Sequence, residues 1–180
     1  VETVLIPASP ALYGEKSDRH TACVSSQVGC AYGCKFCASG LDGFTRNLTA
    51  DEIVGQLMAV EKHAGRKINN IVFMGMGEPL ANFKNLSKAL DIITGHWGMN
   101  IGARHITIST SGLAPMIKKL ADRPQQIRLA ISLHGATNDT RDKIMPVNSK
   151  WKIDELFEAL HYYKSKSKKR ITFEYILIKG

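Results

Sequence analysis

The sequence of 180 residues lacks several features that would assign it to a specialised class of protein. It has no apolar run approaching the roughly 18 residues that a membrane-spanning helix needs, so no membrane association is expected. Its 44% hydrophobic and 22% charged residues are typical of a globular chain and exclude a collagen-like or disordered one. The first residues have no basic region followed by a long apolar stretch, so they do not form a signal peptide.

Cysteine is absent from most of the chain. The four cysteines are Cys23, Cys30, Cys34 and Cys37, and none follows Cys37. A disulfide framework distributes its cysteines along the chain, whereas a cluster of this kind is typical of metal ligands or redox groups in a cytoplasmic protein. We therefore expect a cytoplasmic location and metal or redox chemistry in this stretch.

Acidic residues are scarcer than basic ones, 16 against 24, which gives a formal net charge of +8 and a pI near 9.4. Such a surface raises the expectation of a nucleic-acid partner. The one dense basic cluster runs from Lys164 to Arg170. It is interpreted either as an RNA contact or as a solvated helix end, where lysines also favour the negative pole of the helix dipole.

Strand-like apolar segments alternate with amphipathic helical segments along most of the chain. The expected strands are 1–6, 22–27, 68–74, 105–109, 126–132 and 171–178, and the first two are expected to pair as a hairpin around a loop at 7–19. The expected helices begin at a capping box, Thr49 to Glu52, and at 83, 113, 139 and 153. This alternation predicts a parallel sheet, either a barrel or an open doubly wound sheet. The sequence shows no G-x-G-x-x-G fingerprint after the first expected strand.

In either architecture the functional groups lie on the loops that follow the carboxyl ends of the strands. Those loops come after Gln27, Met74, Ser109 and Ser132, and each carries unusual residues. Their coincidence at one edge of the sheet predicts an active site there.

The loop after the second strand contains the motif C-x3-C-x2-C, formed by Cys30, Cys34 and Cys37. Gly29 and Gly33 allow the tight turns that would let three thiolates converge on one centre. Three ligands leave one coordination position open, which suits catalysis, since an added ligand can occupy it. The alternative is a structural zinc site completed by Cys23 or a distant histidine.

These motifs resemble the radical S-adenosylmethionine (SAM) superfamily, whose cysteine motif is followed downstream by G-x-G-E-P, here residues 75–79. The strings at 23–30, 75–79, 109–112 and 132–134 closely resemble the RlmN family, which methylates carbon 2 of adenosine in 23S rRNA and tRNA. The resemblance runs along the whole chain. It implies an α/β fold, a partial (β/α) TIM-like barrel with a short N-terminal β-hairpin at residues 1–28 and a radical SAM core at residues 29–180.

The resemblance also implies the cofactors. A 4Fe–4S cluster would be held by Cys30, Cys34 and Cys37, with SAM on its remaining iron, and one-electron reduction would cleave SAM to a 5′-deoxyadenosyl radical. The SAM contacts implied by the family are Gly77, Glu78, Ser109, Ser132, Leu133 and His134. On their own, a serine or histidine at a strand end is more often a turn, packing or surface residue.

Two further residues match positions that react in the family. Cys23 matches a cysteine that helps to resolve a protein–RNA adduct, and Glu2 matches a proton-accepting glutamate. Without the family, Cys23 is a small buried apolar residue and Glu2 an exposed carboxylate. The methyl-carrying cysteine of the family has no counterpart, so we expect a fragment that binds the cluster and SAM but does not complete methyl transfer.

The implied partners are 23S rRNA, tRNA and an external, flavodoxin-like one-electron reductant, with the protein acting as a monomer. Two alternatives stay open. One is a Cfr-like methyltransferase acting on carbon 8 of adenine, and the other is a non-catalytic RNA-binding module with structural zinc.

Overall fold

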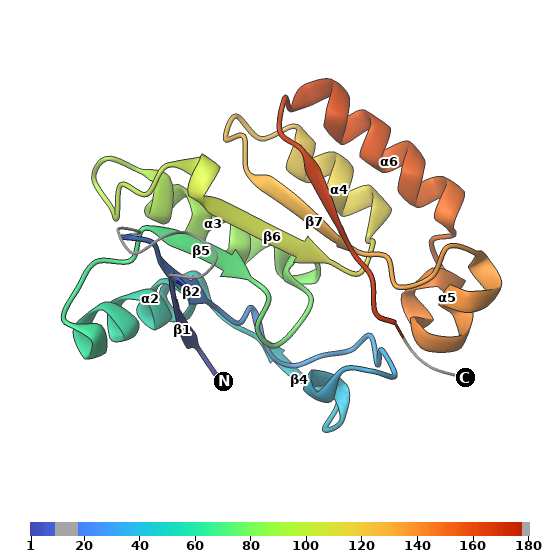
Figure 1. Cartoon of the computed structure of the whole chain (residues 1–180), viewed down its shortest axis with the longest axis horizontal. Coiled ribbons are helices and arrows are strands. Elements are labelled where there is room, and N and C mark those ends of the chain that lie inside the picture. The colour runs from blue at the N-terminus through green and yellow to red at the C-terminus, as the bar shows by residue number, and fades with distance from the viewer. Residues whose placement is uncertain (10–17, 178–180) are drawn as a thin grey trace.

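The computed structural model describes residues 1–9 and 18–177, which form a mostly parallel six-stranded sheet with helices (Figure 1). The strand order is β1-β2-β5-β6-β7-β8. Their bounds are β1 Val4–Pro7, β2 His20–Cys23, β5 Asn70–Phe73, β6 Ile106–Thr110, β7 Arg128–Ser132 and β8 Ile171–Glu174. β1 pairs antiparallel with β2 as the expected hairpin, and all later neighbours are parallel.

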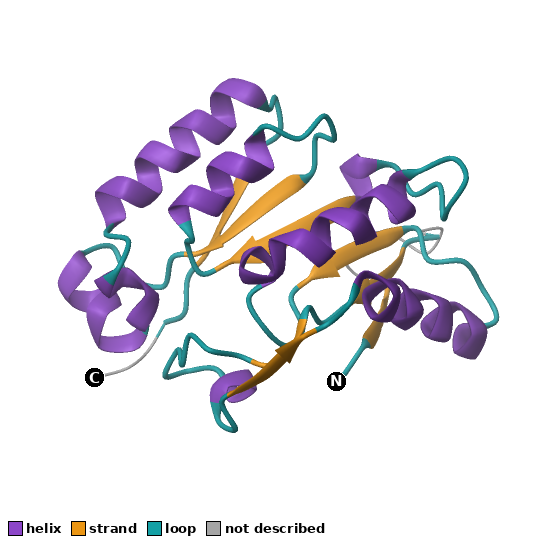
Figure 2. Ribbon diagram, turned by 180° about the vertical axis from the view of Figure 1, so that it is seen from behind, coloured by secondary structure: helices purple, strands orange, loops and turns teal. Residues whose placement is uncertain are grey.

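Four helices that connect the parallel strands cover one face of this sheet, which Figure 2 shows from behind. They are α2 Ala50–Ala64, α3 Phe83–Thr94, α4 Ala114–Ala121 and α6 Ile153–Lys166. The short helix α5, Asn138–Ile144, lies beyond the carboxyl ends of the strands. A doubly wound sheet carries helices on both faces and changes direction at a switch point. Here strands follow one another in chain order, so the partial barrel is confirmed, with β1 and β8 as edges of the sheet in the described part of the chain.

The hydrophobic core lies between the sheet and these helices. Ile71 lies beside Ile106 and Ile108 beside Leu129 in the strand register, and all four side chains are fully buried. Side chains alternate between the two faces of a strand, so the opposite face receives the polar residues, among them the side chain of Ser109. The core thus fixes which side chains face the concave side of the partial barrel.

The helix ends follow the expected local signals. The Thr49 side chain accepts a hydrogen bond from the Glu52 N–H, and the Glu52 carboxylate accepts one from the Thr49 N–H, which completes the capping box of α2. Pro115 lies in the first turn of α4, and Pro146 follows the end of α5. No helix in the described residues has the length and apolar character needed to cross a membrane.

Two of the expected strands differ from the structure. The strand at 22–27 is interrupted: β2 ends at Cys23, and β3, Gln27–Gly29, pairs instead with β4, Phe44–Asn47, which was not predicted. The break occurs because the Ser25 N–H donates to the Gln56 side chain and the Ser26 N–H to the Met76 carbonyl. The last strand stops at residue 174 rather than 178, and most of the predicted loop at 7–19 lies outside the described residues.

Candidate active site

A cavity of about 270 Å³ lies at the carboxyl ends of the parallel strands, against the cysteine loop. Its walls come from segments far apart in the sequence. They are Cys30, Tyr32, Cys34, Phe36 and Cys37 of the cysteine loop, residues 73–75 and 77–79 after β5, residues 109–111 of β6 and its loop, Ser132, Met145 and Glu174. The predicted meeting of several strand-end loops is therefore present in the structure.

The cysteine loop is held at its base and on its far side. At the base, the Cys30 N–H donates to the Gly43 carbonyl at 3.0 Å, and a Cβ added to Gly29 would lie 1.9 Å from that carbonyl oxygen. Gly29 and Gly33 both have positive φ angles, +72° and +56°, as the predicted tight turns require. On the far side, the Lys35 N–H donates to the carbonyl of Ile144 at the end of α5. The loop is thus fixed to two separate parts of the fold.

The three thiols of this loop are free, half-buried and electrostatically coupled. Burial raises the pKa of Cys34 to about 11, with further increases from the charges of Cys30 and Cys37, while Arg141 opposes them. Burial is also the main cause of the raised pKa of Cys30. Thiolates that repel one another in this way are stabilised by a bound cationic centre.

The three cysteines of this loop are a donor set that fits an iron–sulfur cluster. A closed zinc site needs four ligands converging on one atom, whereas cluster cysteines bind separate irons. Cys30, Cys34 and Cys37 open on a cavity instead, which leaves room beside them for a further ligand.

The loop after β5 presents a fully buried carboxylate to the cavity. One oxygen of Glu78 accepts from the Leu80 N–H at 3.0 Å, and the other accepts from the Ser111 N–H at 2.7 Å and its hydroxyl at 2.8 Å. Burial raises the pKa of Glu78, and the bonds from Ser111 and Leu80 counteract this increase. The carboxylate is therefore positioned by the protein before any ligand binds.

The interrupted strand at residues 24–27 holds the same loop from the other side. The Met76 carbonyl accepts from the Ser26 N–H at 2.9 Å, and the Gln27 side-chain oxygen accepts from the Glu78 N–H at 2.8 Å. A Cβ on Gly77, whose φ is +94°, would lie 2.4 Å from the Gln27 Cβ. Only glycine fits at this position, which explains its place in the motif.

The serines predicted at the ends of β6 and β7 meet at one carboxylate. The hydroxyls of Ser109 and Ser132 both donate to the same oxygen of Glu174, each at 2.9 Å. Glu174 is the last residue of β8, and its side chain lines the cavity. These three residues form a polar wall contributed by three adjacent strands.

Leu133 and His134 lie beside the cavity rather than in its lining. Both backbone N–H groups donate to the Glu174 carbonyl, and the His134 Nδ1 accepts from the Ile176 N–H at 3.2 Å. The His134 ring packs edge-on against Phe36, which lines the cavity, with ring centroids 4.6 Å apart. Burial lowers the pKa of His134, so its ring is neutral and serves as an acceptor.

Arg141 of α5 is the largest fully buried side chain in the described residues, and it connects the cavity loops. Its Nη1 donates to the carbonyls of Ser132 and Leu133 at 3.1 and 2.7 Å, and its Nη2 donates to the Ser111 carbonyl at 2.9 Å. Its Nε donates to the Asn148 side chain. One guanidinium thus ties the loop after β6 to the loop after β7.

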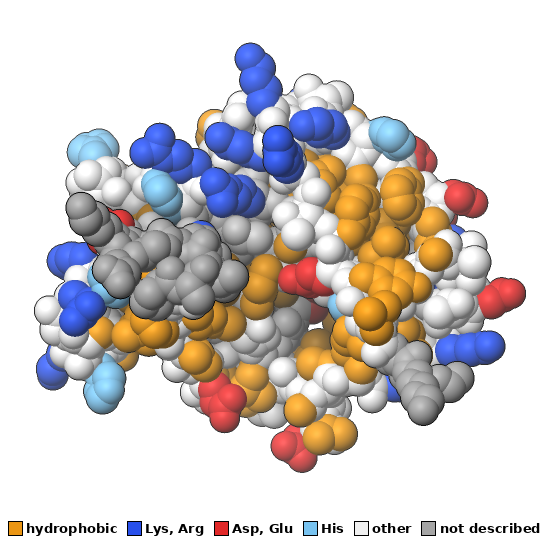
Figure 3. All heavy atoms as spheres, in the orientation of Figure 1, with side chains coloured by type: hydrophobic (Ala, Val, Ile, Leu, Met, Phe, Trp, Pro, Cys, Tyr) orange, Lys and Arg blue, Asp and Glu red, His pale blue; other side chains and the backbone are white. Residues whose placement is uncertain are grey.

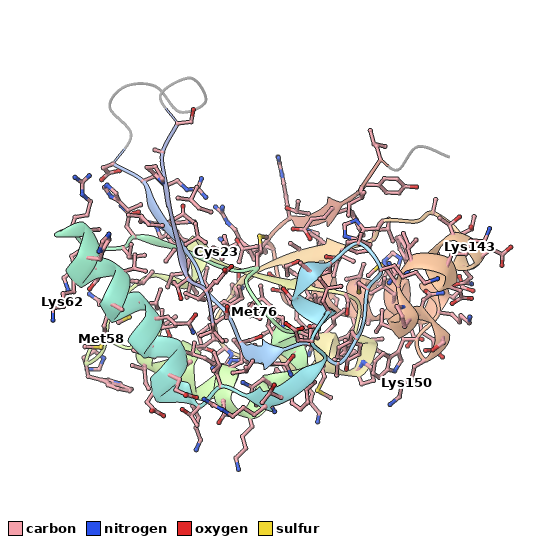
Figure 4. The ribbon with its side chains drawn as sticks, turned by 90° about the horizontal axis from the view of Figure 1, so that it is seen from below. Cys23, Met58, Lys62, Met76, Lys143 and Lys150 are labelled. Atoms are coloured by element: carbon pink, nitrogen blue, oxygen red, sulfur yellow. The ribbon has the colours of Figure 1, made fainter. Side chains whose placement is uncertain are left out.

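The two residues matched to reactive positions lie farther from the cavity wall. Cys23 ends β2 next to the backbone of Met74, a cavity residue, and burial raises its pKa. The Glu2 side chain is exposed, while its carbonyl accepts from the Ser25 hydroxyl at 2.7 Å. Figure 4 shows Cys23 and Met76 near the middle of the molecule, with Lys62 of α2 to one side and Lys143 of α5 to the other.

Seven of the predicted site residues line the cavity, namely Cys30, Cys34, Cys37, Gly77, Glu78, Ser109 and Ser132. The sequence analysis missed Glu174 and Arg141. Glu174 carries the same signal as the serines, a polar residue at a strand end, but the predicted strand continued past it. Arg141 had no signal, because its role depends on the two loops that it reaches.

Comparison with known proteins gives one family match, to the radical SAM superfamily, over residues 24–180. A relative from Akkermansia muciniphila, described as "Probable dual-specificity RNA methyltransferase RlmN", is 63% identical over 179 residues, which cover 99% of this chain and 50% of the relative. A relative with the same description from Dictyoglomus turgidum is 51% identical, covering 100% and 50%. The chain thus spans about half the length of these curated relatives.

One solved structure is similar to this chain in both fold and sequence. The crystal structure of a radical SAM methyltransferase from Sphaerobacter thermophilus is 48% identical and superposes with a TM-score of 0.90. The match covers 99% of this chain and 51% of that one.

Proposed function

Because the chain belongs to the radical SAM superfamily, we propose that the protein is an RNA methyltransferase of the RlmN type. Its proposed reaction is methylation of carbon 2 of adenosine in 23S rRNA and tRNA. The observation that supports it most is the shared cavity, where three cysteines of one loop face polar residues from the ends of four other segments.

In this proposal Cys30, Cys34 and Cys37 would hold a 4Fe–4S cluster, and the adjoining cavity would receive SAM. Such a cluster would supply, from an external flavodoxin-like reductant, the electron needed to cleave SAM to a 5′-deoxyadenosyl radical. We assign the binding and orientation of SAM to side chains of this chain.

Those side chains bind and orient the cofactor. Glu78 offers buried carboxylate oxygens to the ammonium of a methionine group, and its fixed hydrogen bonds avoid reorganisation on binding. Ser109, Ser132 and Glu174 form a wall of hydroxyl and carboxylate groups suited to ribose hydroxyls. Leu133 and His134 support this wall through the β8 backbone and Phe36.

Glu2 and Cys23 are proposed to act on the RNA rather than on SAM. The Glu2 side chain is exposed to solvent, so its carboxylate can accept a proton from an RNA substrate that approaches from solution. Cys23, half-buried beside Met74, would assist in releasing a protein–RNA adduct. Both roles are consistent with positions outside the cavity lining.

Anaerobic reconstitution with iron and sulfide tests the cofactor part of this proposal. We expect a coloured protein that releases 5′-deoxyadenosine from SAM after reduction, and a Cys34→Ala variant that is colourless and inactive. A Cys23→Ala variant is the matched control and should keep both the colour and SAM cleavage. Stoichiometric zinc without SAM cleavage in the unaltered protein would instead support a structural metal module.

The substrate part is tested separately, by mapping methylated positions on 23S rRNA and tRNA treated with a protein that contains this chain together with the methyl-carrying cysteine of the family. Methylation at carbon 2 of adenosine is expected. Methylation at carbon 8 would contradict the proposed position and support the Cfr-like alternative, and an absence of methylated adenosine would contradict both.

A further inference from the structure

A second and larger cavity, about 1090 Å³, lies at the opposite end of the sheet, where the strands begin. Its walls come from the residues that precede or start β2, β5, β6, β7 and β8. It shares no lining residue with the cavity at the cysteine loop. The strand length of β6, five residues at about 3.3 Å each, separates the two by about 16 Å.

The charged side chains of this cavity are mainly basic. Arginine and lysine contribute Arg19, Lys67, Arg104, Arg128 and Lys169, against two acidic residues, Asp18 and Glu61. Glu61 is already engaged, since it accepts from Lys67 at 3.0 Å and from the Ile68 N–H at 2.9 Å. The five basic residues outnumber the two acidic ones, so this end of the sheet has a net positive surface.

Arginines at this end of the sheet contact histidine rings. The Arg104 Nε donates to the His105 Nε2 at 3.0 Å, and the nearby Arg66 lies 3.0 Å from the His20 ring nitrogen. Burial lowers the pKa of His105, and the charges of Arg104, Arg128 and Arg19 lower it further. Positive charges packed this closely repel one another, and a bound anion relieves that repulsion.

The basic surface extends beyond the cavity, as the Lys and Arg side chains at the top of Figure 3 show. Lys166, the last residue of α6, and the following residues Lys168 and Arg170 add to it next to the cavity residue Lys169. A small phosphate compound is recognised by donors converging on one point. Cations spread along a rim instead match the repeated charges of a phosphodiester chain.

We propose that the cavity at the starts of the parallel strands, which we call the basic cavity, is a docking site for the phosphate backbone of RNA. The proposal rests on the proposed function in taking RNA as the substrate class, and it assigns a binding surface remote from the cysteine loop. Contacts of this kind position the RNA without reading its sequence.

The test measures RNA affinity of the protein without cluster or SAM, by fluorescence anisotropy with a labelled oligouridylate over a range of salt concentrations. The variant is Arg104→Gln/Arg128→Gln/Lys169→Gln. The matched control is Lys84→Gln/Lys88→Gln/Lys119→Gln, which removes three exposed charges from α3 and α4. Both variants lose the same net charge.

We expect the basic-cavity variant to bind RNA about tenfold or more weakly near physiological salt, with the slope of log K against log salt reduced by about 2. The control should stay within about threefold of the unaltered protein. Equal losses of RNA affinity in both variants would mean that net charge alone determines the binding, and would overturn the proposal.

Two further measurements keep the result interpretable. If the triple variant does not fold, Lys169→Glu alone should still weaken binding, and no loss in that variant would overturn the site. Titration with inorganic triphosphate is the second, and tight triphosphate binding that leaves RNA affinity unchanged would overturn RNA docking. Because no step needs the cluster, RNA binding can succeed while adenosine methylation fails, or the reverse.

Discussion

The loops around the cavity at the cysteine loop depend on Arg141, a residue that belongs to no sequence motif. Its guanidinium reaches carbonyls of Ser111, Ser132 and Leu133, so the loops after β6 and β7 share a single buried donor group. A buried cation of this kind persists only where its hydrogen bonds are satisfied. The two loops follow strands that end near Ser109 and Ser132, which we propose contact SAM.

Replacing Arg141 by methionine should destabilise the protein by about 3 kcal/mol or more, because several buried carbonyls would lose their donor. Urea unfolding measures this change. Lys143→Met on the same helix is the control, since Lys143 is exposed and should shift the unfolding free energy by less than about 0.5 kcal/mol. Equal effects of the two substitutions would contradict the role assigned to Arg141.

At the scale of single residues, the sequence was most informative where chemistry is concentrated in short motifs. The cysteine triplet and Gly77 to Glu78 were predicted and lie at one cavity. Glu174 and Arg141 were not, because each is defined by partners that lie in other elements. A motif can show which residues react, but not which distant residues hold them.

Among the elements, α2 combines a helix cap with an ion pair. The Glu52 carboxylate accepts two hydrogen bonds from Arg46, at 2.7 and 2.8 Å, and one from the Thr49 N–H at 2.9 Å. Arg46 is the main cause that lowers the pKa of Glu52 to about 2, from an ordinary value of 4.5. The cap is therefore linked to β4, where Arg46 lies.

This link predicts a pH dependence. A carboxyl whose pKa is lower in the folded state stabilises the fold above its unfolded pKa, and this stabilisation is lost as the pH falls through the folded pKa. The unaltered protein should thus be more stable than Glu52→Gln at neutral pH, and the difference should disappear between about pH 4.5 and pH 2. Thermal unfolding over that range measures it, and a difference independent of pH would contradict the assignment. Glu155→Gln, in the first turn of α6, provides the comparison.

The elements themselves were predicted to different degrees. Buried parallel strands and capped helices have strong local patterns, so β5, β6, β7 and all five helices were expected close to their observed places. β4 was missed because all four of its residues are exposed, which removes the alternation that identifies a strand. The division of 22–27 depends on hydrogen bonds to Gln56 and Met76, which local sequence does not encode.

The molecule as a whole has two cavities on one sheet, the cavity at the cysteine loop where the parallel strands finish and the basic cavity where they start. The helices cover the face that holds the core, as Figure 2 shows. The two binding sites that we propose are therefore supported from opposite ends by one rigid sheet.

Hydrogen exchange should reflect this arrangement. Amides of β5, β6 and β7 have neighbouring strands on both sides and mostly buried side chains, so they should exchange most slowly. Amides of the edge strands β1 and β8 should exchange faster. Mass spectrometry of peptides after timed labelling measures both sets, and slower exchange in β8 than in β6 would contradict this order.

Because Glu174 lies at the end of β8, the cavity at the cysteine loop forms only when the chain has folded. The three thiols belong to one short loop, but the wall opposite them is complete only after β8, far along the chain, has paired with β7. An unfolded chain therefore offers no such cavity, and a molecule that fills it binds the native state alone. By mass action, each tenfold increase of that molecule above its dissociation constant adds about 1.4 kcal/mol to the free energy of unfolding. The cavity thus couples occupancy by its ligand to the thermodynamic stability of the folded protein.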